Sequence, residues 1–249
     1  MTDEQHQAEP FISHLVELRN RLLFAGGSVL VVFLILAPFA SDLYEWFAKP
    51  VMANLPQGST MISTEPHGPF FIPFKFAFAV AFALAIPVVL YQLWAFIAPG
   101  LYQNEKNIAL PLVVSSTLLF YAGILFAYYV VFPIIFKFFA SVAPEGVAVM
   151  PDISAYMSFA LKLFFAFGVA FEVPVATILL VKMGVVTTES MAEKRPYIIV
   201  GAFVIGMLMT PPDIFSQVML ALPVWFLFEV GLFFARKIED KQLGHEQKS

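Results

Sequence analysis

Two glutamates beside predicted membrane spans could bind a ligand with adjacent arginines. Glu17 precedes the first span, and Glu105 lies in the short loop between the second and third spans. A carboxylate pairs with guanidinium in a bidentate geometry that lysine does not match. Both residues also have a structural interpretation. Glu17 could pair with Arg21 at i, i+4 on an interfacial amphipathic helix, and Glu105 could complement a helix N-terminus capped by Asn104.

Two further acidic residues lie in or beside later spans. Glu172 falls within the fourth span, just before Pro174. A charged group at such depth costs roughly 2.5–3.5 kcal/mol, so we expect Glu172 to face a polar cavity rather than lipid. Lys162 lies about 15 Å away along the helix axis, too far to pair with it directly. Asp213 opens the sixth span, where a carboxylate also suits a helix N-terminus.

The elements that position these residues are membrane helices. The 249 residues are 60% hydrophobic and only 13% charged, which excludes an ordinary soluble domain. Long apolar runs without period-2 alternation predict an all-α integral membrane protein rather than a β-barrel. The fifth span is short, at roughly 21 Å of helix. Six spans are predicted, at 22–40, 70–97, 108–135, 156–181, 197–210 and 214–235.

The distribution of basic residues predicts the orientation. Ten of the 14 lysines and arginines fall in the two termini and the two loops on the same side. The positive-inside rule therefore places both termini in the cytoplasm. The whole chain, 1–249, is predicted to form one six-helix membrane domain, with an amphipathic segment in the tail 1–21 and a second cytoplasmic tail at 236–249. The longest loop, 41–69, is too short for a soluble catalytic domain.

Enzymatic, metal and cofactor sites are excluded by the residue inventory. The chain has no cysteine, and its four histidines show no metal-ligand spacing. It contains no His-Glu-x-x-His motif, no Gly-x-Ser-x-Gly motif and no Gly-rich phosphate loop. A net charge of −4 gives no footprint for nucleic acid. We therefore expect no catalytic residue, no metal and no cofactor.

Several sequence blocks together resemble one membrane-protein family. They begin with His-Leu-Val-Glu-Leu-Arg at 14–19 and continue with Pro-Val-Val-Leu-Tyr-Gln-Leu-Trp-Ala-Phe at 87–96. Further blocks are Phe-Gly-Val-Ala-Phe-Glu-Val-Pro at 167–174, Lys-Arg-Pro-Tyr at 194–197 and Thr-Pro-Pro-Asp-Ile-Phe-Ser-Gln at 210–217. In this order they resemble the TatC family, the polytopic subunit of the twin-arginine protein translocase.

The resemblance implies a fold and a set of site residues. It implies a concave, glove-like six-helix receptor with short fifth and sixth helices and cytoplasmic termini. Glu17 and Glu105, the two carboxylates on the cytoplasmic side, would bind the paired arginines of a signal peptide. The matched positions for signal binding are Glu17, Arg19, Phe96 and Glu105. Glu172 matches a polar contact within the membrane, and Pro50 and Asp213 match positions linked to translocation. One departure is Asn104, where many members carry histidine.

The resemblance also implies partners and an energy source. The ligands would be twin-arginine signal peptides of folded precursors. Single-span subunits of the TatA and TatB types would assemble with this chain in a hetero-oligomer in the inner membrane. The proton-motive force would supply the energy for transport. Two alternatives stay open. One is an ion-coupled secondary transporter or proton channel with Glu172 as the proton carrier, and the other is a purely structural scaffold in which Glu17 and Glu105 are replaceable.

Overall fold

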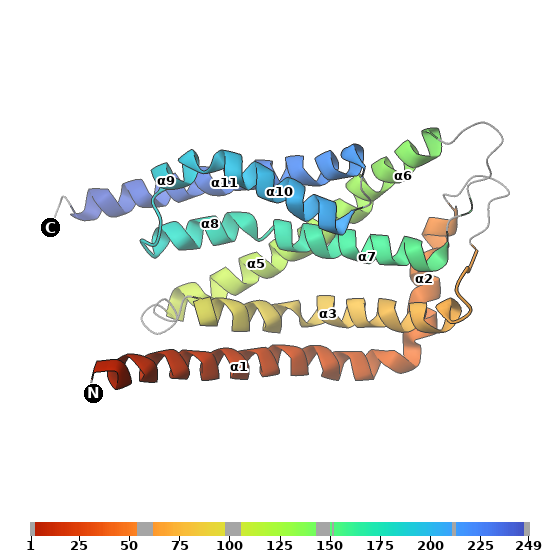
Figure 1. Ribbon diagram of the computed structural model, residues 1–249, viewed down its shortest axis with the longest axis horizontal. Helices are drawn as coiled ribbons and strands as arrows, with labels where there is room; N and C mark the ends of the chain where they lie inside the picture. The colour runs from red at the N-terminus through yellow and green to blue at the C-terminus, as the bar shows by residue number, and fades with distance from the viewer. Residues whose placement is uncertain are drawn as a thin grey trace. The chain divides into compact units, whose positions relative to one another are not determined.

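The computed structural model describes residues 3–53, 62–97, 106–142, 150, 152–210 and 213–246, and its elements are labelled in Figure 1. Regular secondary structure in these residues is helical, which confirms the all-α prediction. The helices are α1 Asp3–Leu36, η1 Ala37–Phe39, α2 Ala40–Ala53, α3 Gly68–Ile97, α5 Lys106–Phe126, η2 Ala127–Val131, α6 Phe132–Ser141, α7 Ile153–Ala170, α8 Val173–Lys182, α9 Thr188–Glu193, α10 Arg195–Met209 and α11 Ile214–Glu246.

Within the described residues, five helical stretches are long and apolar enough to cross a membrane. They are Ser13–Ala48, Gly68–Ile97, Leu110–Phe139, Ile153–Lys182 and Ile214–Lys241. The 15-residue α10 is a shorter apolar helix, in agreement with the short fifth span predicted from the sequence. Thr210, which precedes Pro211, ends this helix in an extended conformation, as expected for a residue before proline.

The chain divides into two compact units. The first contains Met1–Pro50 and Phe70–Thr117, and the second contains Val51–Pro69 and Leu118–Ser249. In the first unit, α1 and α3 lie side by side (Figure 1), with the Phe33 and Phe78 rings 5.6 Å apart between centroids. α3 is tied to α5 by a hydrogen bond of 2.8 Å from Trp94 Nε1 to the buried Ser116 Oγ.

The second unit is held together by close helix crossings. α11 packs against α8 and α10 (Figure 1). A Cβ atom at Gly231 of α11 would lie 2.8 Å from Pro174 Cα of α8, so only glycine permits this approach. A Cβ at Gly123 of α5 would lie 2.4 Å from the Phe167 carbonyl oxygen of α7. These contacts bring backbones together where larger residues would hold them apart.

The first span differs from its prediction at both ends. The segment predicted as a separate amphipathic entry is continuous with the span, because α1 runs unbroken from Asp3 to Leu36. The chain then bends at η1, where Pro38 occupies the first turn. It continues as α2, so about half of the predicted loop 41–69 is helical. Asp42 in the first turn of α2 favours this helix through the helix dipole.

Two later spans also differ from the prediction. The fourth is divided at Phe171 and Glu172 into α7 and α8, since Pro174 near the start of α8 cannot continue the hydrogen-bonding pattern. The expectation of a short sixth helix is wrong, because α11 has 33 residues. Its extension past the predicted end at 235 consists mainly of good helix formers, and no proline interrupts it.

Candidate functional site

The carboxylate of Glu17 is held by an arginine on the same helix. Arg21 donates to Glu17 Oε1 from Nη2 at 2.6 Å and from Nε at 2.9 Å. Residues four apart on a helix share one face, so the i, i+4 pairing predicted from the sequence is confirmed. The Glu17 side chain keeps 40% of its surface exposed. A half-exposed ion pair of this kind exchanges partners at little cost.

The ion pair lies in an open cavity between α1 and α3. Arg21 Nη1 also donates to Gln92 Oε1 of α3 at 3.3 Å, which links the two helices. The cavity has a volume of about 510 Å³. Its lining combines hydroxyl, amide, charged and aromatic groups, contributed by Ser13, Val16, Glu17, Asn20, Arg21 and Phe24 of α1 and by Tyr91 and Gln92 of α3. This size and chemistry suit one or two side chains of an extended peptide.

Phe96 and Arg19 occupy different positions relative to this cavity. The Phe96 ring of α3 stacks on the His14 imidazole of α1, with centroids 4.4 Å apart and planes 17° apart. This stack lies one helical turn before Glu17, so the structure brings Phe96 close to it. The exposed Arg19 instead hydrogen-bonds the neighbouring Asn20 side chain and does not line the cavity.

Glu172 lies at the break between α7 and α8. Only 9% of its surface is exposed, so it is buried in protein rather than open to lipid. Its backbone N–H donates to the Val169 carbonyl at 3.0 Å, and its carbonyl accepts from Ala176 N–H at 2.9 Å. Glu172 thus takes part in backbone hydrogen bonds on both sides of the break, although Pro174 has no N–H to donate, and the acidic side chain is placed inside the second unit.

The remaining predicted site residues have separate positions. Asp213 accepts a hydrogen bond from Ser216 N–H at 2.6 Å, so its carboxylate caps α11 as its structural interpretation predicted. Pro50 lies within the backbone of α2, and its side chain is outside the described residues. Glu105 and Asn104 are also outside them. In the part of the chain that is described, no group of three His, Asp or Glu residues is placed to hold a metal ion.

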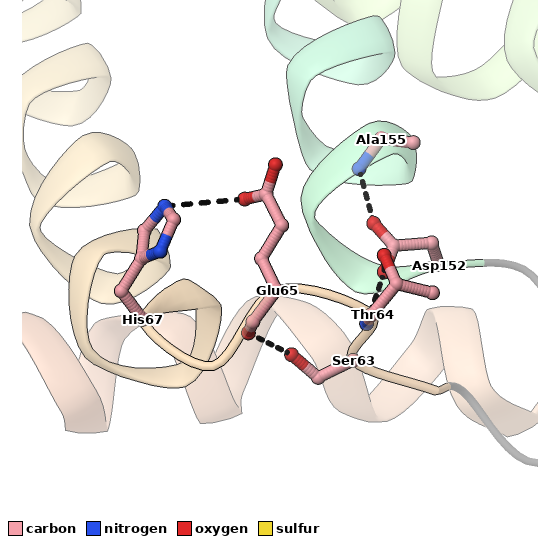
Figure 2. Close-up of polar contacts among 6 residues, drawn as sticks. All are labelled: Ser63, Thr64, Glu65, His67, Asp152 and Ala155. Atoms are coloured by element: carbon pink, nitrogen blue, oxygen red, sulfur yellow. Dashed lines mark hydrogen bonds and ion pairs between the residues drawn. The ribbon is translucent and has the colours of Figure 1, made fainter.

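Two polar contacts were not anticipated from the sequence. Arg195 at the start of α10 makes a bidentate pair with Glu229 of α11, at 2.6 and 2.9 Å. Asp152 joins the segment before α3 to the start of α7 (Figure 2). An aspartate directly before an apolar run is a typical N-cap pattern, so the capping role of Asp152 could have been predicted. Its hydrogen bonds with Thr64, by contrast, could not have been predicted from the sequence.

Comparison with known proteins identifies the family. The model of the family described as Sec-independent protein translocase protein (TatC) matches residues 13–223. The chain belongs to the TatC family. This confirms the resemblance found in the sequence.

Relatives and solved structures agree with this assignment. A TatC from Azotobacter chroococcum mcd 1 is 56% identical over 239 residues, covering 96% of this chain and 94% of the relative. TatC of Escherichia coli K12 is 54% identical, covering 96% and 93%. A crystal structure described as a twin arginine translocase receptor, TatC, superposes with a TM-score of 0.81 at 41% identity, covering 90% of this chain and 98% of that one.

Family membership fixes the broad role of the chain. TatC proteins are translocase subunits and not enzymes. The long apolar helices make this chain a multi-pass membrane protein of the twin-arginine transport system.

Proposed function

We propose that this chain is the signal-peptide receptor of a twin-arginine translocase. The paired arginines of a folded precursor's signal peptide bind Glu17 in the α1–α3 cavity, and Glu105 provides the second carboxylate. The observation that carries this proposal is the half-exposed Glu17 carboxylate at an open cavity of about 510 Å³. Both bonds from Arg21 end on Oε1. Within the described residues, Oε2 is therefore open to an incoming guanidinium.

The aromatic groups beside Glu17 complete this proposed site. Phe96 fixes the His14 ring by stacking, and Tyr91 and Phe24 line the cavity. Arginine stacks on aromatic faces as well as pairing with carboxylates, whereas lysine offers only a point charge. This chemistry would explain a preference for arginine over lysine. Arg19 does not line the cavity but hydrogen-bonds Asn20, which does, so it shapes the site indirectly.

The wider arrangement follows the orientation predicted from the basic residues. The six spans form one glove-like membrane domain in the inner membrane, with both termini in the cytoplasm. Glu172 and Asp213, with Pro50, then act after signal binding, where single-span TatA-type and TatB-type subunits assemble in a hetero-oligomer. The proton-motive force supplies the energy, because the sequence holds no nucleotide-binding motif.

The test is photo-crosslinking of a twin-arginine signal peptide to purified chain. Glu17→Gln and Glu105→Gln remove charge without changing size. Each should weaken binding about ten-fold or more, because a charged hydrogen bond contributes roughly 1.5–3 kcal/mol. Glu193→Gln, at an exposed glutamate of α9, serves as the matched control and should bind normally.

Two results would overturn the proposal. One is equal binding of a peptide in which both arginines are lysines. The other is unchanged binding by the double variant Glu17→Gln, Glu105→Gln, which is the outcome that a structural scaffold predicts. Solute uptake by the reconstituted chain alone would instead favour the transporter.

A further inference from the structure

The segment before α3 and the residue before α7 are joined by a short parallel β-bridge. Ile62 pairs with Asp152, and Ile153 N–H donates to the Ile62 carbonyl at 2.9 Å. These residues belong to two different connections between spans, on the side opposite the termini in the proposed orientation. Both lie in the second compact unit. The bridge therefore fastens one connection directly onto the first turn of α7.

The Asp152 carboxylate adds two hydrogen bonds across this junction and one to the first turn of α7. Thr64 donates to Oδ2 from its N–H at 2.8 Å and from its hydroxyl at 2.7 Å. Ala155 N–H donates to Oδ1 at 2.9 Å, which caps α7. Figure 2 shows the carboxylate between these donors. We call Ile62, Thr64 and Asp152 the outer clasp.

The segment is shaped so that Thr64 can reach this carboxylate. The Ser63 hydroxyl donates to the Glu65 carbonyl at 2.9 Å, and Gly68 N–H donates to the same carbonyl at 3.0 Å (Figure 2 shows the first bond). These bonds close a turn that leads directly into α3. The donors from Thr64 and Ala155 also hold the pKa of the Asp152 carboxyl at about 2, below its usual range. The carboxylate thus stays charged on an acidified outer side.

We propose that Asp152 is a positioning residue for transport, which keeps the outer clasp closed throughout the transport cycle. The clasp fixes the start of α7, and Glu172 lies at the far end of this same helix, directly after its last turn. Loss of the clasp would leave the start of α7 uncapped and the outer segment free. This inference rests on the proposed function for its transport readout but not for its structural one.

The absence of cysteine from the chain gives a direct test. In Thr64→Cys, Asp152→Cys, a disulfide would join the two segments covalently in place of the contact between their native side chains. We expect the oxidised pair to transport a twin-arginine precursor within about two-fold of wild type. The reduced pair should lose transport several-fold, and reoxidation should restore it. Thr64→Ser keeps the hydroxyl and should behave as wild type.

Asp152→Asn is the second variant. Its amide nitrogen cannot accept from Thr64 or Ala155, so one half of the junction is lost while size is kept. We expect faster hydrogen exchange over 153–158, unchanged exchange in α11, normal signal-peptide binding at Glu17 and reduced transport. Wild-type exchange and transport in Asp152→Asn would overturn the proposal. The proposal would also be overturned if the oxidised Thr64→Cys, Asp152→Cys variant folded and bound the peptide but transported only after reduction. That result would mean that the clasp has to open during transport.

The two proposals fail in different ways. If the wild-type chain bound no twin-arginine peptide, the receptor proposal would fall. The exchange rates at the start of α7 and the oxidation of the cysteine pair would still report on the clasp. If peptide binding were normal and the clasp variants behaved as wild type in both readouts, only the clasp proposal would fall.

Discussion

The α1–α3 cavity and the α8–α11 crossing represent opposite ways of building a membrane protein. Along Ser13–Ala48, only 6% of the most apolar window is buried, against 56% along Ile153–Lys182. The contacts between α1 and α3 include two ring pairs, His14 with Phe96 and Phe33 with Phe78, and one hydrogen bond from Arg21 to Gln92. α8 and α11 meet backbone to backbone at Gly231. The proposed binding site lies where the packing is loose, and the buried Glu172 lies where it is tight.

This contrast predicts how each region responds to substitution. At the α8–α11 crossing the backbones are in contact, so a larger side chain cannot be accommodated without moving them. Substitutions there should therefore lower stability before they affect binding. Around Glu17, the side chains are partly exposed and can rearrange, so substitutions there should change binding while stability stays nearly constant.

The largest expected effect is at the tight crossing. Gly231→Ala places a methyl group 2.8 Å from Pro174 Cα and 3.1 Å from Thr177 Cβ. Because backbone has to move, we expect a loss of roughly 1–3 kcal/mol or more, measured as the free energy of unfolding in detergent. Gly201→Ala in α10 meets nothing within 4 Å. It should be neutral or slightly stabilising. Equal free energies of unfolding for Gly231→Ala and Gly201→Ala would show that the α8–α11 crossing is not packed more tightly than the surroundings of Gly201.

The next effect is expected at a buried hydrogen bond between α3, which lines one side of the cavity, and α5. Trp94→Phe removes the 2.8 Å bond to Ser116, whose side chain is fully buried. An unsatisfied buried hydroxyl costs about 1–3 kcal/mol, so thermal unfolding should shift downward. Adding Ser116→Ala should recover part of the loss. A double variant as unstable as the sum of both singles would show that the bond itself contributes little.

A smaller effect on stability, with a clear effect on binding, is expected at Arg21. Arg21→Gln removes the cation that occupies Glu17 Oε1. We expect the unfolding free energy to change by no more than about 0.5 kcal/mol, and the Kd for a twin-arginine peptide to fall several-fold because the internal competitor is gone. Peptide titration by fluorescence anisotropy measures this. Weaker binding would mean that Arg21 positions Glu17 rather than competing for it.

The smallest effect is expected from acid at the outer clasp. The folded-state pKa of Asp152 is lowered from 3.8 to about 2. Its contribution to stability is therefore complete above about pH 4 and is lost as the pH falls toward 2. The difference in unfolding midpoint between wild type and Asp152→Asn should be constant from pH 7 to 5. It should shrink only in strong acid, and a change near neutrality would contradict this assignment.

Local spacing predicted the contacts that lie within one helix. The Glu17–Arg21 pair and the Asp213 cap each follow from residues three or four positions apart. Pro174 explains why the fourth span is divided, but the span was predicted as one segment at 156–181. Helix ends were less predictable. Nothing in the hydropathy of the tail indicated that α11 would extend to Glu246 or that α2 would occupy the first loop.

Contacts between distant residues could not be predicted from spacing. Thr64 and Asp152 lie 88 positions apart, and Arg195 and Glu229 lie 34 apart. Their pairing depends on which helices become neighbours, and one sequence does not contain that information. Phe96 was selected only through the family resemblance, and its stacking on His14 supplies the physical reason that the sequence lacked.

The unbroken course of α1 has a mechanical consequence under the proposed function. Its 34 residues form a rod about 51 Å long, and Glu17 sits part-way along it. If a precursor binds Glu17 as proposed, any pull on it along the axis of α1 would be carried by this rod, because a hydrogen-bonded helix is stiff along its axis. The load would reach the contact of Phe33 with Phe78, about 24 Å away. The rod ends at η1, where Pro38 occupies the first turn, so an axial load on α1 would end there.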